Sequence, residues 1–366
     1  MEIKTDSFVL RAWRGSDADQ VFDACQDPAI QRWTRVPVPY LREHAVGFVT
    51  GAASGQFGIF DHDGLLLGSI GVVDHDVEAR VAEIGYWVAP GGRGRGVTTE
   101  ALKLVCRWAF DTLRVQRLLW RARIGNLPSQ LVAERAGFVM EGVQREALIE
   151  RDGEPVDGMV GALLPADLAR MEEHGFPTVD GRRTRVFSSP PPVLVEGPVT
   201  LRAPELRDAD DMLVACVDPE ILRWTSMPLG YTREMAESFV GFTARQWQRG
   251  TAAIFAVCGP DDRWAGNMDL RISAADPTLG EVGFMTAPWA RGQGHCTAAL
   301  RAVSRWGFEE LGLVRIEWNA FVGNDGSRRV AEKAGFVVEG TQRGRLRHRG
   351  EPVDSWIGAK LATDPH

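Results

Sequence analysis

The sequence predicts two α/β domains of the same fold, joined in tandem. Two stretches, Glu83 to Ala101 (EIGYWVAPGGRGRGVTTEA) and Glu281 to Ala299 (EVGFMTAPWARGQGHCTAA), match each other at an offset of 198 residues. Each runs from an apolar, strand-like segment through a proline and an Arg-Gly-x-Gly turn into a helix. A chain of 366 residues is also too long for one hydrophobic core and suits two domains of about 170 residues.

Composition narrows the class of protein. The hydrophobic content of 44% and the charged content of 25% are typical of a globular protein. The net charge of −7 argues against nucleic acid or an anionic membrane as the main partner, and it favours a cationic or amine substrate.

Cysteine and histidine usage, together with hydropathy, indicates the compartment. The five cysteines are scattered without a CxxC pair and the seven histidines form no HxxxH cluster, so we expect free thiols and no metal site. No apolar run approaches the roughly 20 residues of a membrane span, and the first residues lack the apolar region of a signal peptide. We therefore expect a cytoplasmic protein.

The first segments of the two halves repeat at a smaller offset of 191 residues. A strand is predicted at Phe8 to Arg11, and Ser16 is a suitable cap for the helix that follows it. Because the offset grows to 198 before the second glycine turn, seven extra residues enter the second half. We expect them to lengthen the helix at Arg233–Trp247 relative to the one at Arg42–Val49, and to change the substrate side rather than the core.

Strands and helices alternate through the rest of each half. Strand character is found at Gly58–Phe60, Leu65–Val73 and Gln116–Ala122, and again at Ala253–Val257, Trp264–Ile272 and Arg315–Ala320. The apolar stripe of each helix after a glycine turn, starting at Leu102 or Leu300, indicates core packing rather than a cofactor box. A short helix opened by Asn126 or Asn324 then ends at a Gly-Phe pair. This order predicts a sheet whose ligand corner lies at the carboxyl ends of the strands.

The glycine turns are candidate phosphate sites. Glycines free the backbone to approach a ligand with its N–H groups, and the following helix adds its positive N-terminal end. A single glycine-rich turn before a helix binds no ligand about as often as it binds one. Two copies in matching contexts favour a phosphate-binding site. Neither copy ends in the Gly-Lys-Ser/Thr of a P-loop, and neither has the context of a dinucleotide-binding GxGxxG.

These residues resemble a known family. Arg-Gly-x-Gly after a Glu-x-Gly strand, followed by NxxS and E[RK]xGF, resembles the GNAT N-acetyltransferases, and LR…DA, DP…RWT and EGxxR resemble their ribosomal-protein-alanine (RimJ/RimL-like) branch. The resemblance covers both halves nearly end to end. It implies two domains, 1–170 and 198–366, each with a mixed, mostly antiparallel central sheet flanked by helices. The Pro- and Ser-containing segment 171–197 suits an extended linker.

The resemblance implies acetyl-CoA as cofactor. The turn amides would hold its pyrophosphate, and the backbone just before the turn would pair with the pantetheine and polarise the thioester carbonyl. The cofactor-binding residues implied are Trp87, Val88, Arg93, Gly94, Arg95, Gly96, Val97, Thr98 and Asn126, and Met285, Thr286, Arg291, Gly292, Gln293, Gly294, His295, Cys296 and Asn324. The sequence departs from the family at Thr98 and Cys296, where Ala or Gly is usual, and both replacements are compact. For each Asn, a helix cap and a cofactor contact are compatible.

Catalysis needs a proton acceptor and a proton donor. Glu83 and Glu281 are the candidate bases, through water, at the head of the strand that enters each turn, and the alternative for each is a solvated strand-end glutamate. Many GNAT enzymes use a tyrosine four residues before the Gly-Phe, where this sequence has alanine in both halves. Ser129 and Ser327 lie one helical turn earlier on the same face. The resembled branch uses a serine here near the CoA sulfur, which implies that these two serines hydrogen-bond the CoA thiolate first and protonate it second.

The acceptor side is marked only by aromatic residues. Trp33 and Tyr40, and their counterparts Trp224 and Tyr231, are candidates to line the acceptor cleft, with core or loop-anchoring roles as the alternative. We therefore predict an acyl-CoA-dependent N-acyltransferase that transfers acetyl to a primary amine, either a protein N-terminus or a small molecule, with the halves packed as a pseudo-dimer. The alternative is that one or both halves bind acetyl-CoA without catalysis.

Overall fold

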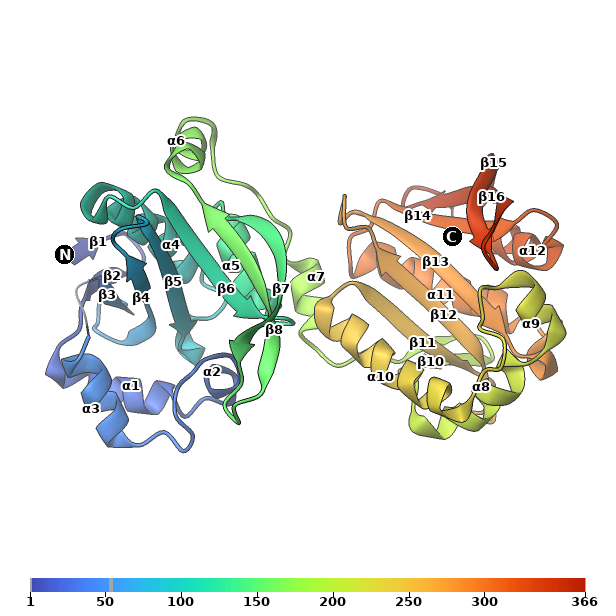
Figure 1. Cartoon of the computed structure of the whole chain (residues 1–366), viewed down its shortest axis with the longest axis horizontal. Coiled ribbons are helices and arrows are strands. Elements are labelled where there is room, and N and C mark those ends of the chain that lie inside the picture. The colour runs from blue at the N-terminus through green and yellow to red at the C-terminus, as the bar shows by residue number, and fades with distance from the viewer. Residues whose placement is uncertain (1, 53–54, 366) are drawn as a thin grey trace. The chain divides into compact units, whose positions relative to one another are not determined.

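The chain folds into two compact units. The computed structural model describes residues 2–52 and 55–365, and it divides into a first unit that ends at Asp180 and a second that begins at Gly181. Each unit contains one eight-stranded mixed sheet flanked by helices (Figure 1). The predicted fold class is therefore confirmed.

The first unit consists of ten strands and helices that lead up to the glycine turn and seven elements that follow it. In order they are β1 (Glu2–Lys4), β2 (Val9–Ala12), η1 (Gly15–Asp17), α1 (Ala18–Ala24), α2 (Pro28–Trp33), α3 (Arg42–Thr50), β3 (Gln56–Phe60), β4 (Leu66–Asp76), β5 (Val81–Val88), η2 (Pro90–Gly92), α4 (Val97–Trp108), η3 (Ala109–Leu113), β6 (Arg117–Arg123), α5 (Leu127–Arg135), β7 (Val139–Ile149), β8 (Pro155–Leu163) and α6 (Pro165–His174).

The second unit begins with one additional helix and then repeats this series without counterparts of η3 and α6. Its elements are α7 (Arg182–Phe187), β9 (Leu194–Glu196), β10 (Val199–Arg202), η4 (Leu206–Asp208), α8 (Ala209–Cys216), α9 (Pro219–Trp224), α10 (Arg233–Arg249), β11 (Ala252–Cys258), β12 (Trp264–Ile272), β13 (Leu279–Thr286), η5 (Pro288–Ala290), α11 (His295–Glu309), β14 (Arg315–Phe321), α12 (Asp325–Lys333), β15 (Val337–His348) and β16 (Glu351–Leu361). As expected, the extra residues lengthen a helix: α10 has 17 residues where α3 has 9.

The two sheets have the same topology. The strand order is β1-β2-β3-β4-β5-β6-β8-β7 in the first unit, and β9 to β16 follow the same order in the second. The pairs β5/β6 and β13/β14 are parallel and the other pairs are antiparallel. Pairing of β5 with β6 ends at Glu83 and Leu119, although β5 continues to Val88. The two strands therefore separate, and the end of β5 has an edge that β6 does not pair.

The core lies between each sheet and the helix that follows the glycine turn. Leu102 and Val105 of α4, and Leu300 and Val303 of α11, are fully buried. Burial of a leucine or valine side chain contributes about 1.5–3 kcal/mol. The prediction that the apolar stripe packs in the core is therefore confirmed.

A bidentate ion pair fixes the start of each unit. Arg11 Nη1 and Nη2 lie 2.8 and 2.9 Å from the two carboxylate oxygens of Asp17, and Arg202 pairs with Asp208 at 2.9 and 2.8 Å. Asp17 also accepts the backbone N–H of Arg14 at 2.8 Å. The predicted cap at Ser16 is thus wrong, because α1 begins at Ala18 and follows a 3₁₀ turn that contains Ser16.

The segment expected to be an extended linker contains helical structure. Met171 lies in α6 and is buried in the first core, and α7 occupies 182–187. Phe187 at the end of α7 packs edge-on against Trp247, with 4.7 Å between ring centroids. An extended linker across the whole segment is therefore wrong, because apolar side chains within it are buried against each unit. The long hairpins β7/β8 and β15/β16 were not predicted either.

Candidate active sites

The glycine turns adopt a conformation that other residues rarely take. Gly94 and Gly96 have φ of 72° and 75°, and Gly292 and Gly294 have φ of 76° and 80°. A Cβ atom placed on any of the four would meet no atom within 4 Å. The left-handed φ therefore accounts for glycine here, and these corners face open space.

Each turn leads directly into a helix whose first N–H groups have no helical acceptor. Gly96 and Gly294 are the N-caps of α4 and α11, and neither helix has a side-chain cap. The first intrahelical bond of α4 joins the N–H of Glu100 to the Gly96 carbonyl at 3.2 Å. The N–H groups of residues 97–99 therefore point out of the positive end of the helix, which suits an anionic group.

The first arginine of each turn is held by a helix cap. Arg93 Nη2 lies 2.5 Å from Asp27 Oδ1, and Arg291 Nη2 lies 2.5 Å from Asp218 Oδ1. Asp27 and Asp218 also cap α2 and α9. The bond with Arg93 is the largest influence on Asp27 and lowers its pKa. Burial raises the pKa of Asp218, but Arg291 and backbone N–H groups outweigh it and lower the pKa overall. This structural role of the Asp-Pro pair was missed, although its repetition in the sequence signalled it.

The other two polar residues of the turns bond within the turn. Arg95 Nη1 donates to the Gly91 carbonyl at 3.4 Å, and Gln293 Nε2 donates to the Trp289 carbonyl at 2.7 Å. Of the residues that begin the following helices, Val97, Thr98 and His295 are buried, and Cys296 is half-buried. The Cys296 thiol lies against Thr286, and burial raises its pKa to about 11.

The predicted pantetheine residues lie on the separated end of each strand. Trp87 and Val88 come after the last pairing of β5 with β6, and Met285 and Thr286 come after the last pairing of β13 with β14. On their other side they pair with β4 and β12. The backbone on the open side of these residues can therefore hydrogen-bond a ligand in the way that a further strand would.

The two candidate serines have equivalent environments. Ser129 Oγ accepts the indole N–H of Trp120 at 3.1 Å, and Ser327 Oγ accepts that of Trp318 at 3.0 Å. An indole N–H can only donate, so each hydroxyl keeps its own proton for another acceptor. Asn126 caps α5 through the N–H of Ser129 at 3.4 Å, and Asn324 caps α12 in the same way at 3.1 Å. The predicted caps are therefore confirmed, whereas the two tryptophans were missed.

Tyr86 brings the serine of the first unit next to β5. Its hydroxyl donates to the Ser129 carbonyl at 2.8 Å, and burial raises its pKa. The second unit has Phe284 at this position and lacks the hydroxyl. The contact shows that the start of α5 lies beside the separated end of β5.

Both candidate bases are ion-paired. Glu83 Oε2 accepts from Arg121 Nε at 2.8 Å and from Arg121 Nη2, and Glu281 Oε1 accepts from Arg271 Nη2 at 2.7 Å. The Arg121 guanidinium comes from β6, whereas Arg271 comes from β12 and also pairs with Asp269. Protonation of either glutamate must therefore weaken its ion pair with a guanidinium.

The four aromatic candidates for the acceptor side form two equivalent pairs, of which the tryptophans have matching contacts. Arg32 lies over the Trp33 ring and Arg223 over the Trp224 ring, each 4.7 Å from the centroid. Tyr40 is 5% exposed and belongs to a core cluster of the first unit, beside Cys25. Tyr231 is half-buried, packs against the equivalent core cluster beside Cys216, and also lines a pocket of about 400 Å³ in the second unit. Both tyrosines therefore contact a core cluster, and Tyr231 also faces a cavity.

Within residues 2–52 and 55–365, none of the helices has the length and apolar character needed to span a membrane. The same residues include no group of three or more His, Cys, Asp or Glu side chains that could hold a metal ion.

Comparison with known families decides the assignment. A model of the acetyltransferase (GNAT) domain matches residues 7–139 and, a second time, residues 199–337. The chain belongs to the GNAT acetyltransferase family. Its predicted tandem arrangement of two GNAT domains is thereby confirmed.

Curated relatives carry related names. The chain is 38% identical over 114 residues to the putative ribosomal N-acetyltransferase YdaF of Bacillus subtilis, which is 31% of this chain and 59% of that protein. It is 33% identical over 95 residues to a ribosomal-protein-serine acetyltransferase of Escherichia coli, which is 25% of this chain and 51% of that protein. The chain thus spans about half to three fifths of the length of these relatives.

Solved structures of the family match just under half of the chain. RimJ of Mycobacterium smegmatis in complex with CoA-disulfide is 22% identical, with a TM-score of 0.43, and the match covers 47% of this chain and 88% of that one. The microcin C7 self-immunity acetyltransferase MccE, in complex with acetyl-CoA and AMP, is 20% identical with a TM-score of 0.42, covering 45% of this chain and 93% of that one.

Proposed function

We propose that this GNAT chain transfers an acetyl group from acetyl-CoA to a primary amine. The observation that carries the proposal is the combination, in both units, of an open glycine corner, an unpaired strand end and a serine hydroxyl that accepts an indole N–H. The glycine corner suits a diphosphate, and the unpaired strand end suits an extended amide chain. The serine hydroxyl suits a developing thiolate.

The residues that would hold acetyl-CoA follow from these features. The N–H groups of residues 94–98 and 292–296 bind the pyrophosphate, and the backbone of residues 87–88 and 285–286 binds the pantetheine. The glycines fit this role because a Cβ atom would occupy the open corner that the diphosphate needs. Bound acetyl-CoA supplies an activated acyl group.

The transfer needs a neutral amine. An alkylammonium releases one proton, through water, toward Glu83 or Glu281, and its nitrogen lone pair then forms the new C–N bond. The C–S bond breaks, the sulfur keeps its electron pair, and it takes the second proton that the amine nitrogen loses as the amide forms. Ser129 or Ser327 donates a hydrogen bond to that sulfur. The products are the acetamide, free CoA and the proton taken from the ammonium.

The acceptor is proposed at the level of a protein N-terminal amine or a small-molecule amine. Support for a protein acceptor comes from relatives that are named as ribosomal-protein acetyltransferases. A cytoplasmic location and packing of the halves as a pseudo-dimer stay predictions. Retention of both a glutamate and a serine in each unit favours catalysis over a module that only binds acetyl-CoA.

Thiol release with a panel of amines tests the proposed reaction. Removal of a general base costs roughly 10²-fold or more, so a Glu83→Gln/Glu281→Gln double variant should lose about 100-fold in kcat. Each single variant should keep the turnover of the other unit. Glu317→Gln is a matched control, because Glu317 pairs with Arg315 and has no assigned role. Full activity of the double variant would remove the assigned base. Acetyl-CoA binding without thiol release from any amine would support the non-catalytic alternative.

A further inference from the structure

The second unit contains a pocket on the face of its sheet opposite α11. The pocket has a volume of about 400 Å³, which suits a ligand of about amino-acid size. Its walls come mainly from α8 and α10 and include Met212, Phe239 and Phe242, and its floor includes Asn267 of β12 and Met285 of β13. Arg245 is the one charged side chain among the lining residues.

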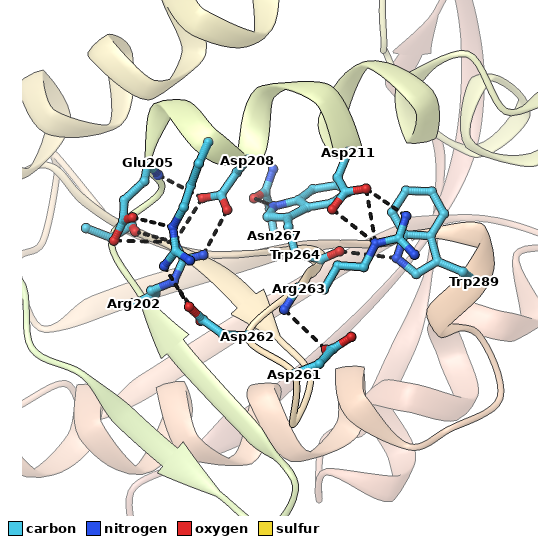
Figure 2. Close-up of polar contacts among 12 residues, drawn as sticks. Arg202, Glu205, Asp208, Asp211, Asp261, Asp262, Arg263, Trp264, Asn267 and Trp289 are labelled. Carbon is cyan, nitrogen blue, oxygen red and sulfur yellow. Dashed lines mark hydrogen bonds and ion pairs between the residues drawn. The ribbon is translucent and has the colours of Figure 1, made fainter.

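The Asn267 side chain is held in one orientation. Figure 2 shows the indole of Trp264 reaching Asn267, whose Oδ1 accepts the indole N–H at 3.1 Å. Because an indole N–H can only donate, the amide oxygen must face Trp264. The Nδ2 group, with two donors, is left for a ligand in the pocket.

Trp264 is itself fixed by a chain of contacts that ends on α8. The Trp289 indole donates to the Trp264 carbonyl at 3.2 Å, and the Arg263 guanidinium lies 4.3 Å from the Trp289 ring centroid. Arg263 in turn pairs with Asp211 at 2.7 Å (Figure 2). The equivalent residues of the first unit are Ser69, Leu66, Gly91, Leu65 and Gln20, so this arrangement belongs to the second unit alone.

Two carboxylates continue the same face of the sheet beyond Asn267. Asp269 is two residues along β12, about 7 Å away, and lies opposite Gly283 of β13. Arg271, the next residue on this face, bonds both Asp269 and Glu281. A Cβ atom at Gly283 would lie 2.6 Å from Asp269 Oδ1, so glycine leaves room for the carboxylate. In the first unit Val73 occupies the equivalent space over Gly85.

A different set of aromatic side chains packs on this side of the first unit. Trp13 contacts Phe48 and Phe60 edge-on at 5.3 and 5.9 Å, and Trp87 packs on the same cluster. The second unit has Pro204, Cys258 and Met285 at the positions of Trp13, Phe60 and Trp87. The acceptor faces of the two units are therefore different, although their glycine corners match.

We propose that the pocket of the second unit selects a primary amine with a large apolar side group and a carbonyl beside the amine. The apolar group fills the Met- and Phe-lined cavity, Asn267 Nδ2 donates to the carbonyl, and Asp269 and Glu281 attract the ammonium. Arg245 disfavours an acceptor with a second positive charge. The N-terminal residue of a peptide and a free amino-acid amide share this chemistry. This inference rests on the proposed acetyl transfer.

The ranking of amine acceptors by kcat/KM, measured with the full chain, tests the inference. Burial of a leucine or phenylalanine side chain is worth about 1.5–3 kcal/mol, or about 10-fold to 150-fold. Leucinamide and phenylalaninamide should therefore exceed glycinamide in kcat/KM by at least about 10-fold, and 1,4-diaminobutane should be poor. Peptides that begin with Leu, compared with leucinamide, distinguish a peptide acceptor from a small molecule. Equal kcat/KM for glycinamide and leucinamide, or a preference for the diamine, would overturn the inference.

Four variants locate the selectivity. Ser238→Trp narrows the pocket from α10 and should lower the leucinamide-to-glycinamide ratio of kcat/KM by about 10-fold. Asn267→Ser introduces the residue of the first unit and should lower kcat/KM for both amides, because both present the carbonyl. Glu237→Gln, at an exposed α10 residue outside the pocket lining, should leave the ratio unchanged, as should Ser69→Ala in the first unit. Loss of selectivity in Ser69→Ala, with none in Ser238→Trp, would overturn the assignment to the second unit.

Failure of the inference is distinguishable from failure of the proposed function. Absence of acetyl-CoA binding would reject the proposed function and this inference together. If acetyl-CoA binds without turnover, calorimetric titration of the CoA-loaded chain with leucinamide and with glycinamide compares the binding affinities of the two amides instead. Weaker or equal binding of leucinamide would then overturn the inference, and tighter binding would support it.

Discussion

Asp269 shows how one residue separates the chemistry of the two units. Burial raises its pKa to about 6, the charge of Glu281 adds to that effect, and Arg271 opposes it. The first unit has Gly71 at this position, and the carboxylate nearest along the sheet is Asp74, the cross-strand partner of Glu83. The second unit therefore has a carboxylate that changes charge between acidic and neutral pH.

The pKa of Asp269 predicts a pH dependence of stability. Between about pH 4 and pH 6 the folded state binds this proton more tightly than the unfolded state, so the contribution of Asp269 to stability falls as the pH rises. Asp269→Asn removes this contribution. The melting temperature of the variant minus that of the natural chain should increase from pH 4 to pH 6 and then level off. Calorimetric scans of both proteins measure it.

The difference in melting temperature between Asp269→Asn and the natural chain is the appropriate measure. Other carboxylates change the stability of both proteins with pH in the opposite direction. Asp27 and Asp218 have lowered pKa values, so their contributions are lost as the pH falls. These contributions cancel in the comparison. A difference that stays constant from pH 4 to pH 7 would contradict the environment assigned to Asp269.

The glycine corner is the element on which the cofactor site depends. Its geometry combines a left-handed backbone, an uncapped helix start and an adjacent strand end without a parallel neighbour. The arginine of the corner is tied to the Asp cap of α2 or α9. The corner is thus anchored at its arginine and open at its glycines.

Substitutions at the glycine corner should distinguish the effect of a strained backbone conformation from the effect of an added side-chain atom. Gly294→Ala places a non-glycine residue at φ 80°, which costs roughly 1–2 kcal/mol, and it should weaken acetyl-CoA binding by the second unit. Gly91→Ala is the matched control, because an added Cβ there also meets no atom within 4 Å and its φ is not left-handed. Calorimetric titration measures both. Equal effects of the two substitutions would contradict the role of backbone conformation.

The cofactor side was largely predictable from the sequence because its determinants are local. Glycines before a helix, an Asn cap and a Gly-Phe helix end each act within a few residues, and the caps and turns lie where expected. The acceptor side was not predictable in this way. Trp264 meets Asn267 beside a register shift between β11 and β12, and Asp269 faces Gly283 through the pairing of β12 with β13. Such contacts depend on sheet register, which the local sequence does not specify.

Across the whole molecule, the duplicated units match at the glycine corner and differ on the sheet face where we propose that the acceptor binds. Tyr40 is buried in a core cluster, whereas the equivalent Tyr231 packs against the matching cluster and also lines the pocket. The longer α10 supplies much of that pocket. That the extra residues change the substrate side stays a prediction. The chain thus combines two similar glycine corners with two different proposed acceptor faces.

Calorimetric titration of the full chain with acetyl-CoA tests the central claim most directly. Because each unit has an open glycine corner and an unpaired strand end beside it, the account predicts saturable binding at two sites per chain. Binding at a single site would contradict the claim that both corners hold the cofactor. No binding at all would contradict the account as a whole.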